Sequence, residues 1–132
     1  MQTTTQHYAD AVVVTTMGRV DHLSAAAFEE ALTPLLALTS ARGGSLVLDL
    51  SGVDYISSVG LRVLMIAAKQ LREPPSRLLV AALQGVVAEI FAISRFDRVL
   101  SVCPNVDAAM QQCSAAAQAA YQAADKTSES GP

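Results

Sequence analysis

Apolar residues are spaced in two different ways along this chain of 132 residues. Short β-branched or continuous apolar runs, typical of strands, alternate with stretches in which apolar residues recur every three or four positions, as in helices. The most regular stretch runs from Ser45 to Ala68. It opens at Leu46 to Leu50 with apolar residues at both even and odd positions, which is typical of a strand buried on both faces in a parallel sheet. After a turn predicted at Ser51–Asp54, apolar residues recur at i, i+3 and i+4 from Leu61 onward, which predicts an amphipathic helix.

Two serines stand directly before this helix. Ser57 and Ser58 occupy the positions where an N-cap residue belongs, and Gly60 leaves the first helical turn narrow. A hydroxyl at this point lies beside free backbone N–H groups at the positive end of the helix dipole, which favours a phosphate. From the residues alone, an ordinary N-cap is the favoured interpretation of Ser58, because serine is common before a helix.

The same two periods predict the other elements. The β-branched run Ala11–Met17 is a strand, and further strands are expected at Gln6–Tyr8, Arg77–Ala82 and Arg98–Cys103. Further helices are expected after Ser24, around residues 86–91, and at about 106–125, followed by a disordered tail at 126–132. This alternation predicts a single α/β domain over residues 1–125, with a central, mostly parallel sheet of four to five strands and four helices packed against it.

Ligands and partners of parallel sheets gather at the carboxyl ends of the strands. The loops that follow those ends are Gly18–Leu23, Ser51–Ser58 and Leu83–Gly85. We therefore expect Asp21, His22 and Ser58 to lie on one edge of the molecule. Asp21 is interpreted either as a residue that stabilises its own loop or as a contact to a partner near Ser58, and His22 as an exposed loop residue or an interface contact.

Charge and composition exclude several functions. A net charge of −3 without a Lys/Arg cluster argues against nucleic-acid binding. No apolar run reaches the roughly 20 residues that span a bilayer, and the N-terminus lacks the layout of a signal peptide, so a cytoplasmic location without membrane contact is expected.

Enzymatic and metal-binding functions also find little support in the sequence. Cys103 and Cys113 lack CxxC spacing and nearby histidines, so free buried thiols are expected, and His7 and His22 are too far apart to suggest a local metal site. Neither a GxxxxGK[ST] nor a GxGxxG string occurs, which disfavours a nucleotide-binding enzyme. We expect no catalytic residues, no metal and no cofactor.

Three stretches resemble one family. The strand followed by VDYISSVGL and an apolar helix is similar to the signature of the STAS family, and within it to that of the bacterial anti-sigma factor antagonists. The segments GRVDHLSA, from Gly18, and GVVAEIFAISRFDRVL, from Gly85, also match the family, although Arg95 stands where Gly is usual. The resemblance covers about residues 8 to 122 and implies the STAS fold.

The resemblance also implies a site. In the family, the first hydroxyl residue after an Asp at the start of this helix is phosphorylated by a partner kinase. That residue is Ser58 here, while Ser57 replaces the Asp and is a second, weaker candidate for the phosphate. The residues expected to bind the partner are Asp21, His22, Ser57, Ser58, Val59 and Gly60.

The function implied is that of a partner-switching regulator, not an enzyme. The unphosphorylated form would bind an anti-sigma factor that is also a serine kinase, phosphorylation of Ser58 would end that complex, and a PP2C-like phosphatase would reset the switch. The chain would be a monomer or a weak homodimer. The alternative is a STAS subunit of a lipid-exporting ABC transporter, which would bind an ATPase instead.

Overall fold

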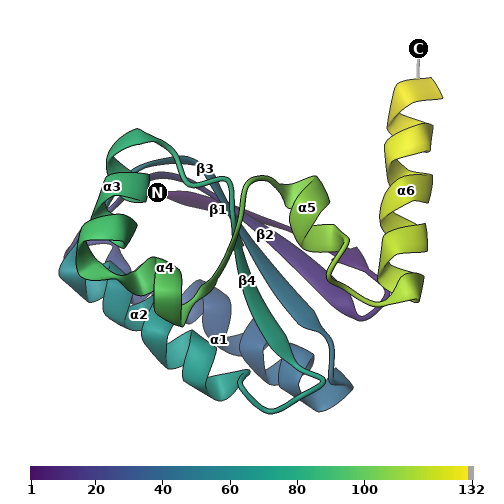
Figure 1. Ribbon diagram of the computed structural model, residues 1–132, viewed down its shortest axis with the longest axis horizontal. Helices are drawn as coiled ribbons and strands as arrows, with labels where there is room; N and C mark the ends of the chain where they lie inside the picture. The colour runs from purple at the N-terminus through teal and green to yellow at the C-terminus, as the bar shows by residue number, and fades with distance from the viewer. Residues whose placement is uncertain (131–132) are drawn as a thin grey trace.

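The computed structural model describes residues 1–130, with side chains up to residue 124, and its centre is a mixed sheet of five strands (Figure 1). The strands are β1 (Gln2–Tyr8), β2 (Ala11–Val20), β3 (Ser45–Ile56), β4 (Arg77–Ala81) and β5 (Ser101–Cys103). They lie side by side in chain order. β1 is antiparallel to β2, and all other neighbours are parallel. The predicted α/β class and mostly parallel sheet are confirmed.

Helices cover both faces of the sheet. One face carries α1 (Ala25–Arg42), α2 (Ser58–Gln70), α3 (Gly85–Ser94) and α4 (Phe96–Val99), and the other carries α5 (Val106–Met110) and α6 (Ala115–Ser130). Because right-handed crossovers between strands in chain order always return on the same side, the connecting helices α1 to α4 share a face. The helices after β5 are free to cover the opposite face (Figure 1).

Alternation along the strands produces two hydrophobic cores. Val12, Val14 and Leu48 point toward α1, α2 and α3, while Val13 and Val47 point toward α5 and α6. This explains why β2 and the first half of β3 are apolar at both even and odd positions. Cys103 and Cys113 belong to the second core as free thiols, as expected, and burial raises the pKa of both.

β2 and β3 are longer than predicted. Gly18 to Val20 and Ser51 to Asp54 were expected in a loop and a turn, but both segments continue the ladder to the pair Val20 and Ile56. The register shifts between Thr15 and Met17 and again after Gly18, so irregular pairing hides the strand pattern in the sequence. Because β4 pairs with β3 only as far as Asp49, this two-stranded extension projects beyond the rest of the sheet.

The C-terminal part also differs from the prediction. The single helix expected at 106–125 is two helices, because Ser114 starts a new one: its hydroxyl accepts the Ala117 N–H at 3.1 Å and donates to Asp10 at 2.5 Å. With α4 standing where the strand Arg98–Cys103 was expected to begin, the described residues form six helices rather than four. The backbone of α6 continues to Ser130, into the tail predicted at 126–132, whose last two residues lie outside the described residues.

Two residues depart from helix rules without breaking the fold. A proline inside a helix removes one backbone hydrogen bond and usually kinks or ends the helix. Nevertheless, α1 is continuous around Pro34, which lies on the exposed side. Arg95 takes the left-handed conformation, with φ of 62°, at the end of α3. It therefore adopts the backbone for which Gly is usual, and its N–H closes the helix on the carbonyls of Ala92 and Phe91.

Candidate functional site

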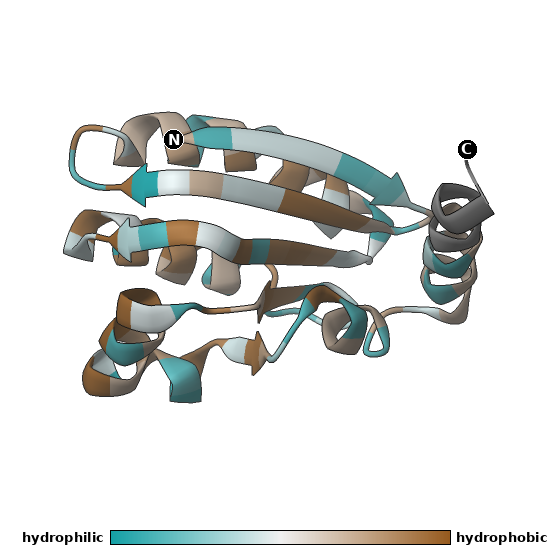
Figure 2. Ribbon diagram, turned by 90° about the horizontal axis from the view of Figure 1, so that it is seen from above, coloured by the Kyte–Doolittle hydropathy of each residue, from teal (hydrophilic) through white to brown (hydrophobic). Residues whose placement is uncertain are grey.

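The extension of β2 and β3 brings the predicted site residues to one edge. Val20 pairs with Ile56, and the N–H of Ser57 donates to the Val20 carbonyl at 2.8 Å. The loop that begins at Asp21 and the start of α2 at Ser58 are thereby joined. Figure 2 shows both at the end of the sheet where the arrows of β2 and β3 terminate, opposite α6.

The two serines take different roles at this edge. Ser57 is the N-cap of α2, and its half-buried hydroxyl accepts the N–H of Gly60 at 3.2 Å. Ser58 is the first helical residue and is exposed. Among the described residues, no hydrogen bond occupies the Ser58 hydroxyl. The sequence left open whether these serines cap the helix or expose a free hydroxyl. In the structure Ser57 caps α2, and Ser58 carries the exposed hydroxyl.

Gly60 holds the helix close to the sheet. A methyl group at this position would lie 2.8 Å from Cγ1 of Ile56 and 3.0 Å from Cγ1 of Val20, and the residue is buried. The sequence placed Gly60 among the partner-binding residues, but the structure gives it a packing role, because its open side faces the core. Its small size sets the position of Ser58 relative to β2 and β3.

Asp21 organises its own loop. Its Oδ1 accepts the N–H groups of Leu23 at 3.0 Å and Ser24 at 3.1 Å, and its Oδ2 lies 3.3 Å from Nε of Arg19. The Arg19 guanidinium in turn lies 4.1 Å from the ring centroid of Tyr55 on β3. Because the carboxylate is already engaged, the loop-stabilising interpretation of Asp21 is favoured over direct contact with a partner.

The Asp21 carboxylate also changes the hydrogen bonding of Ser24, the residue before α1: it accepts the Ser24 N–H. Ser24 occupies the N-cap position but makes no side-chain cap bond, and its hydroxyl instead donates to the Arg19 carbonyl at 3.0 Å. The backbone N–H of Ser24, with weaker help from its hydroxyl and from Leu23, lowers the pKa of Asp21 from its ordinary value of 3.8.

The lowered pKa of Asp21 predicts a pH-dependent contribution to stability. Because the folded state favours the charged carboxylate, its contribution is present above about pH 3.8 and is lost as the pH falls through the folded-state pKa. Asp21→Ala should therefore lower the midpoint of urea unfolding at pH 7, and this difference from wild type should shrink below pH 3.8. Asp21→Asn keeps an acceptor oxygen and should cost less at pH 7. An undiminished difference at low pH would contradict the prediction.

Three apolar side chains are exposed at the edge of the sheet that carries Ser58, each in a segment that follows the end of a different strand. Leu23 is 81% exposed, Val59 is 45% exposed and Val86 is 52% exposed. The neighbouring His22 is also exposed. The sequence singled out Val59 and His22 but missed the other two, because Leu23 belongs to a loop and Val86 to an apolar helix whose buried face cannot be distinguished from its exposed face without the tertiary fold.

A shallow hollow adjoins these residues. It has a volume of about 350 Å³ and lies between the segment Ser51–Asp54 of β3 and the start of α3 at Gln84–Val86. Asp49 makes no hydrogen bond to the amides around Ser58: its carboxylate accepts the Ser51 N–H at 3.0 Å and the Thr15 hydroxyl at 3.5 Å. It lies in mid-strand, before the extension of β3 that carries the chain to Ser58.

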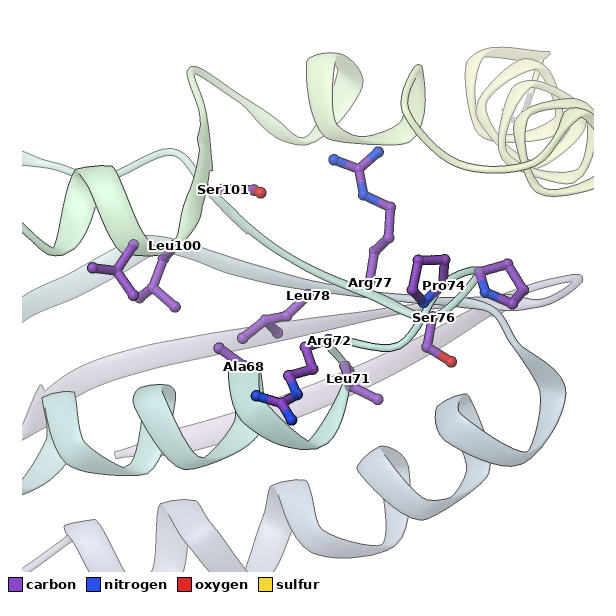
Figure 3. A pocket seen from close by; sticks show the side chains of 11 residues that line it. Ala68, Leu71, Arg72, Pro74, Ser76, Arg77, Leu78, Leu100 and Ser101 are labelled. Carbon is purple, nitrogen blue, oxygen red and sulfur yellow. The ribbon is translucent and has the colours of Figure 1, made fainter.

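Another pocket, of about 350 Å³, lies between the end of α2 and the start of β4 (Figure 3). Ala68, Leu78 and Leu100 line it, but Figure 3 shows the Arg72 and Arg77 side chains pointing in opposite directions, so they do not converge on one ligand. Arg77 instead donates to Gln112 at 2.9 Å. Within the described residues, no three His, Cys, Asp or Glu side chains gather as a metal site requires, and no helix is long and apolar enough to cross a membrane.

Comparison with known proteins agrees with this geometry. Over 63 residues, 48% of this chain, the sequence is 46% identical to BtrV of Bordetella bronchiseptica, which is named as a candidate anti-sigma factor antagonist. The match spans only about half, 54%, of that relative's length. The fold is similar to that of an anti-sigma factor antagonist from Mycobacterium paratuberculosis, with a TM-score of 0.69 at 25% identity over 80% of this chain and 87% of the other.

A further similarity in fold is to the Bacillus cell fate determinant SpoIIAA in its phosphorylated form. The TM-score is 0.60 at 11% identity, over 81% of this chain and 96% of that one. The profile of the STAS domain matches residues 2–109, which include every residue of the edge described above. The chain therefore belongs to the STAS domain family.

Proposed function

We propose that this chain is an anti-sigma factor antagonist that is switched by phosphorylation of Ser58. In its unphosphorylated form it binds an anti-sigma factor with serine kinase activity and so frees the target that this factor holds. The observation that carries the proposal is the pair of serines at the start of α2, in which Ser57 is occupied as a cap and Ser58 is exposed.

The exposure of Ser58 supports its role as the phosphate acceptor. A kinase must reach the hydroxyl oxygen, and the Ser57 oxygen is half-buried and bonded to the Gly60 N–H. A phosphate on Ser58 would extend into solvent beside the first turn of α2, where the helix dipole favours negative charge. The fold would therefore tolerate the modification.

The surroundings of Ser58 support a partner that docks on this edge. Leu23, Val59 and Val86 present apolar surface that no described part of the chain covers. Single exposed apolar residues are common, but three at the edge that carries Ser58 offer a surface for a partner. A dianionic phosphate on Ser58, beside Val59, would weaken docking there because the phosphate keeps its water when a partner approaches. Phosphorylation would act by preventing docking rather than by unfolding the domain.

The domain itself is proposed to be a substrate and a ligand, not an enzyme. Ser58 has no general base beside it among the described hydrogen bonds, as a nucleophile would need. A PP2C-like phosphatase would remove the phosphate and restore binding. The names of three similar proteins support the proposed role. BtrV is named as a candidate anti-sigma factor antagonist, the M. paratuberculosis protein is named as an anti-sigma factor antagonist, and the Bacillus protein SpoIIAA is described in a phosphorylated form.

The phosphosite can be mapped by mass spectrometry on the protein isolated from its own cells. We expect a single phosphate on the peptide that contains Ser57 and Ser58, located on Ser58 and removed by phosphatase treatment. Ser58→Ala should abolish the modification. Ser57→Ala should retain it, because the cap is not the acceptor.

Two results would overturn the proposal. If the peptide remains unmodified under every growth condition, the phosphorylation switch is wrong, and co-purification of an ABC ATPase would then establish the transporter-subunit alternative. If the phosphate is found on Ser57 in the wild-type protein, the division of roles between the two serines is wrong.

A further inference from the structure

The exposed face of α2 is cationic and apolar. Val59, Arg62, Ile66 and Lys69 are spaced by three, four and three residues, which places them on one side of a helix. Val59 and Ile66 are each 45% exposed, and both cations are exposed. The helix contains no acidic residue from Ser58 to Gln70, in a chain whose net charge is −3.

Arg62 has no carboxylate partner among the described side chains. The ion pair found there joins Arg19 to Asp21, in the loop before α1. No hydrogen bond described for this part of the chain uses the Arg62 guanidinium either. An exposed guanidinium with five donors and no carboxylate on its own helix is free to bind an anion that arrives at the same face.

Ser58 and Arg62 are one helical turn apart. Residues at i and i+4 are neighbours on a helix surface, with Cβ atoms about 5–6 Å apart, and an anion N-terminal to a cation is the favourable order. We propose that the Arg62 guanidinium binds the phosphoryl group on Ser58. This inference rests on the proposed function, since it requires that Ser58 is the residue modified.

The pairing gives phosphorylation a second effect. Arg62 and Lys69 give the exposed face of α2 two positive charges, and a phosphoserine brings about −1.5 to −2 charges at pH 7. When Arg62 folds back onto the phosphate, the face loses most of its positive charge as well as its free guanidinium. Modification of one hydroxyl would then alter the surface over more than one turn of the helix, without a change in backbone.

The test uses the full chain with phosphoserine incorporated at position 58 by genetic-code expansion, so it needs neither the kinase nor the partner. The second pKa of the phosphate is measured by a ³¹P NMR titration in wild type, Arg62→Gln and Lys69→Gln. Because a nearby cation favours the dianion, Arg62→Gln should raise this pKa by about 0.3 unit. Lys69→Gln should leave it unchanged, since Lys69 lies three turns from Ser58.

Arg62→Lys is the matched variant, because it keeps the positive charge but lacks the planar guanidinium. In this variant the second pKa of the phosphate should lie close to its wild-type value. If Arg62→Gln titrates as wild type does, or if Lys69→Gln raises the pKa equally, the pairing is wrong. Neither result would affect phosphorylation of Ser58 in cells, so failure of this inference is distinguishable from failure of the proposed function.

Discussion

A Ser58→Asp variant is expected to bind the proposed partner, an anti-sigma factor with serine kinase activity, about 100-fold more weakly than the wild-type protein does. The carboxylate would place a permanent charge beside Val59, at the edge where Leu23 and Val86 also expose apolar surface and where a docked partner would exclude water. Burial of a charge in such an interface costs several kcal/mol, and each 1.4 kcal/mol is tenfold in affinity. Isothermal titration calorimetry with the purified kinase, in the presence of its nucleotide, measures the change.

Ser58→Ala is the control for this prediction. It removes the acceptor hydroxyl but adds no charge, and Ser57 remains to cap α2, so both affinity and thermal stability should remain close to those of wild type. Both variants should unfold at similar temperatures, because position 58 is exposed. If Ser58→Asp binds as tightly as Ser58→Ala, the charge at this position does not control docking.

Gly44→Ala is expected to lower the free energy of unfolding by about 3 kcal/mol or more. A methyl group on Gly44 would lie 1.7 Å from the carbonyl oxygen of Asp10 and 2.8 Å from its carbonyl carbon. The obstacle is backbone, which cannot rotate away as a side chain can. The same carbonyl accepts the N–H of Ser45 at 3.2 Å, so moving it would also disturb the start of β3. Urea unfolding followed by circular dichroism gives the free energy.

Gly85→Ala is the matched control. Gly85 has a positive φ of 39°, but a methyl group there would meet nothing within 4 Å. Its substitution should cost only the conformational strain, about 1 kcal/mol. If the two variants are equally stable, the close approach of Gly44 to Asp10 does not control the stability of this part of the fold.

The sequence by itself determined the fold class and located the serine that we propose as the phosphate acceptor. Apolar residues at both even and odd positions in β2 and β3 require cover on both faces, which only a parallel sheet between two helical layers provides. The two serines before an apolar helix located the candidate site, because an N-cap is a local property of a few consecutive residues. The STAS signature around Ser58 extended this to the family.

The tertiary structure decided which of these residues are exposed and what they contact. The division between Ser57 as cap and Ser58 as free hydroxyl depends on how α2 meets β2, through the Ser57 N–H and the Val20 carbonyl. The sequence indicated only that Gly60 narrows the first turn of α2. The tertiary structure shows that this turn packs against Ile56 and Val20, of which Val20 is distant along the chain.

The same reason explains the residues that were missed. Leu23 and Val86 look in sequence like any loop or core residue, and only the tertiary fold shows that both are exposed at the edge that carries Ser58. The register shifts in β2 hid the extension of the strands that builds this edge, because a bulge breaks the two-residue period. Local patterns thus predicted the fold class and singled out the serine pair, whereas long-range packing decided the strand lengths and which side chains are exposed at the edge that carries Ser58.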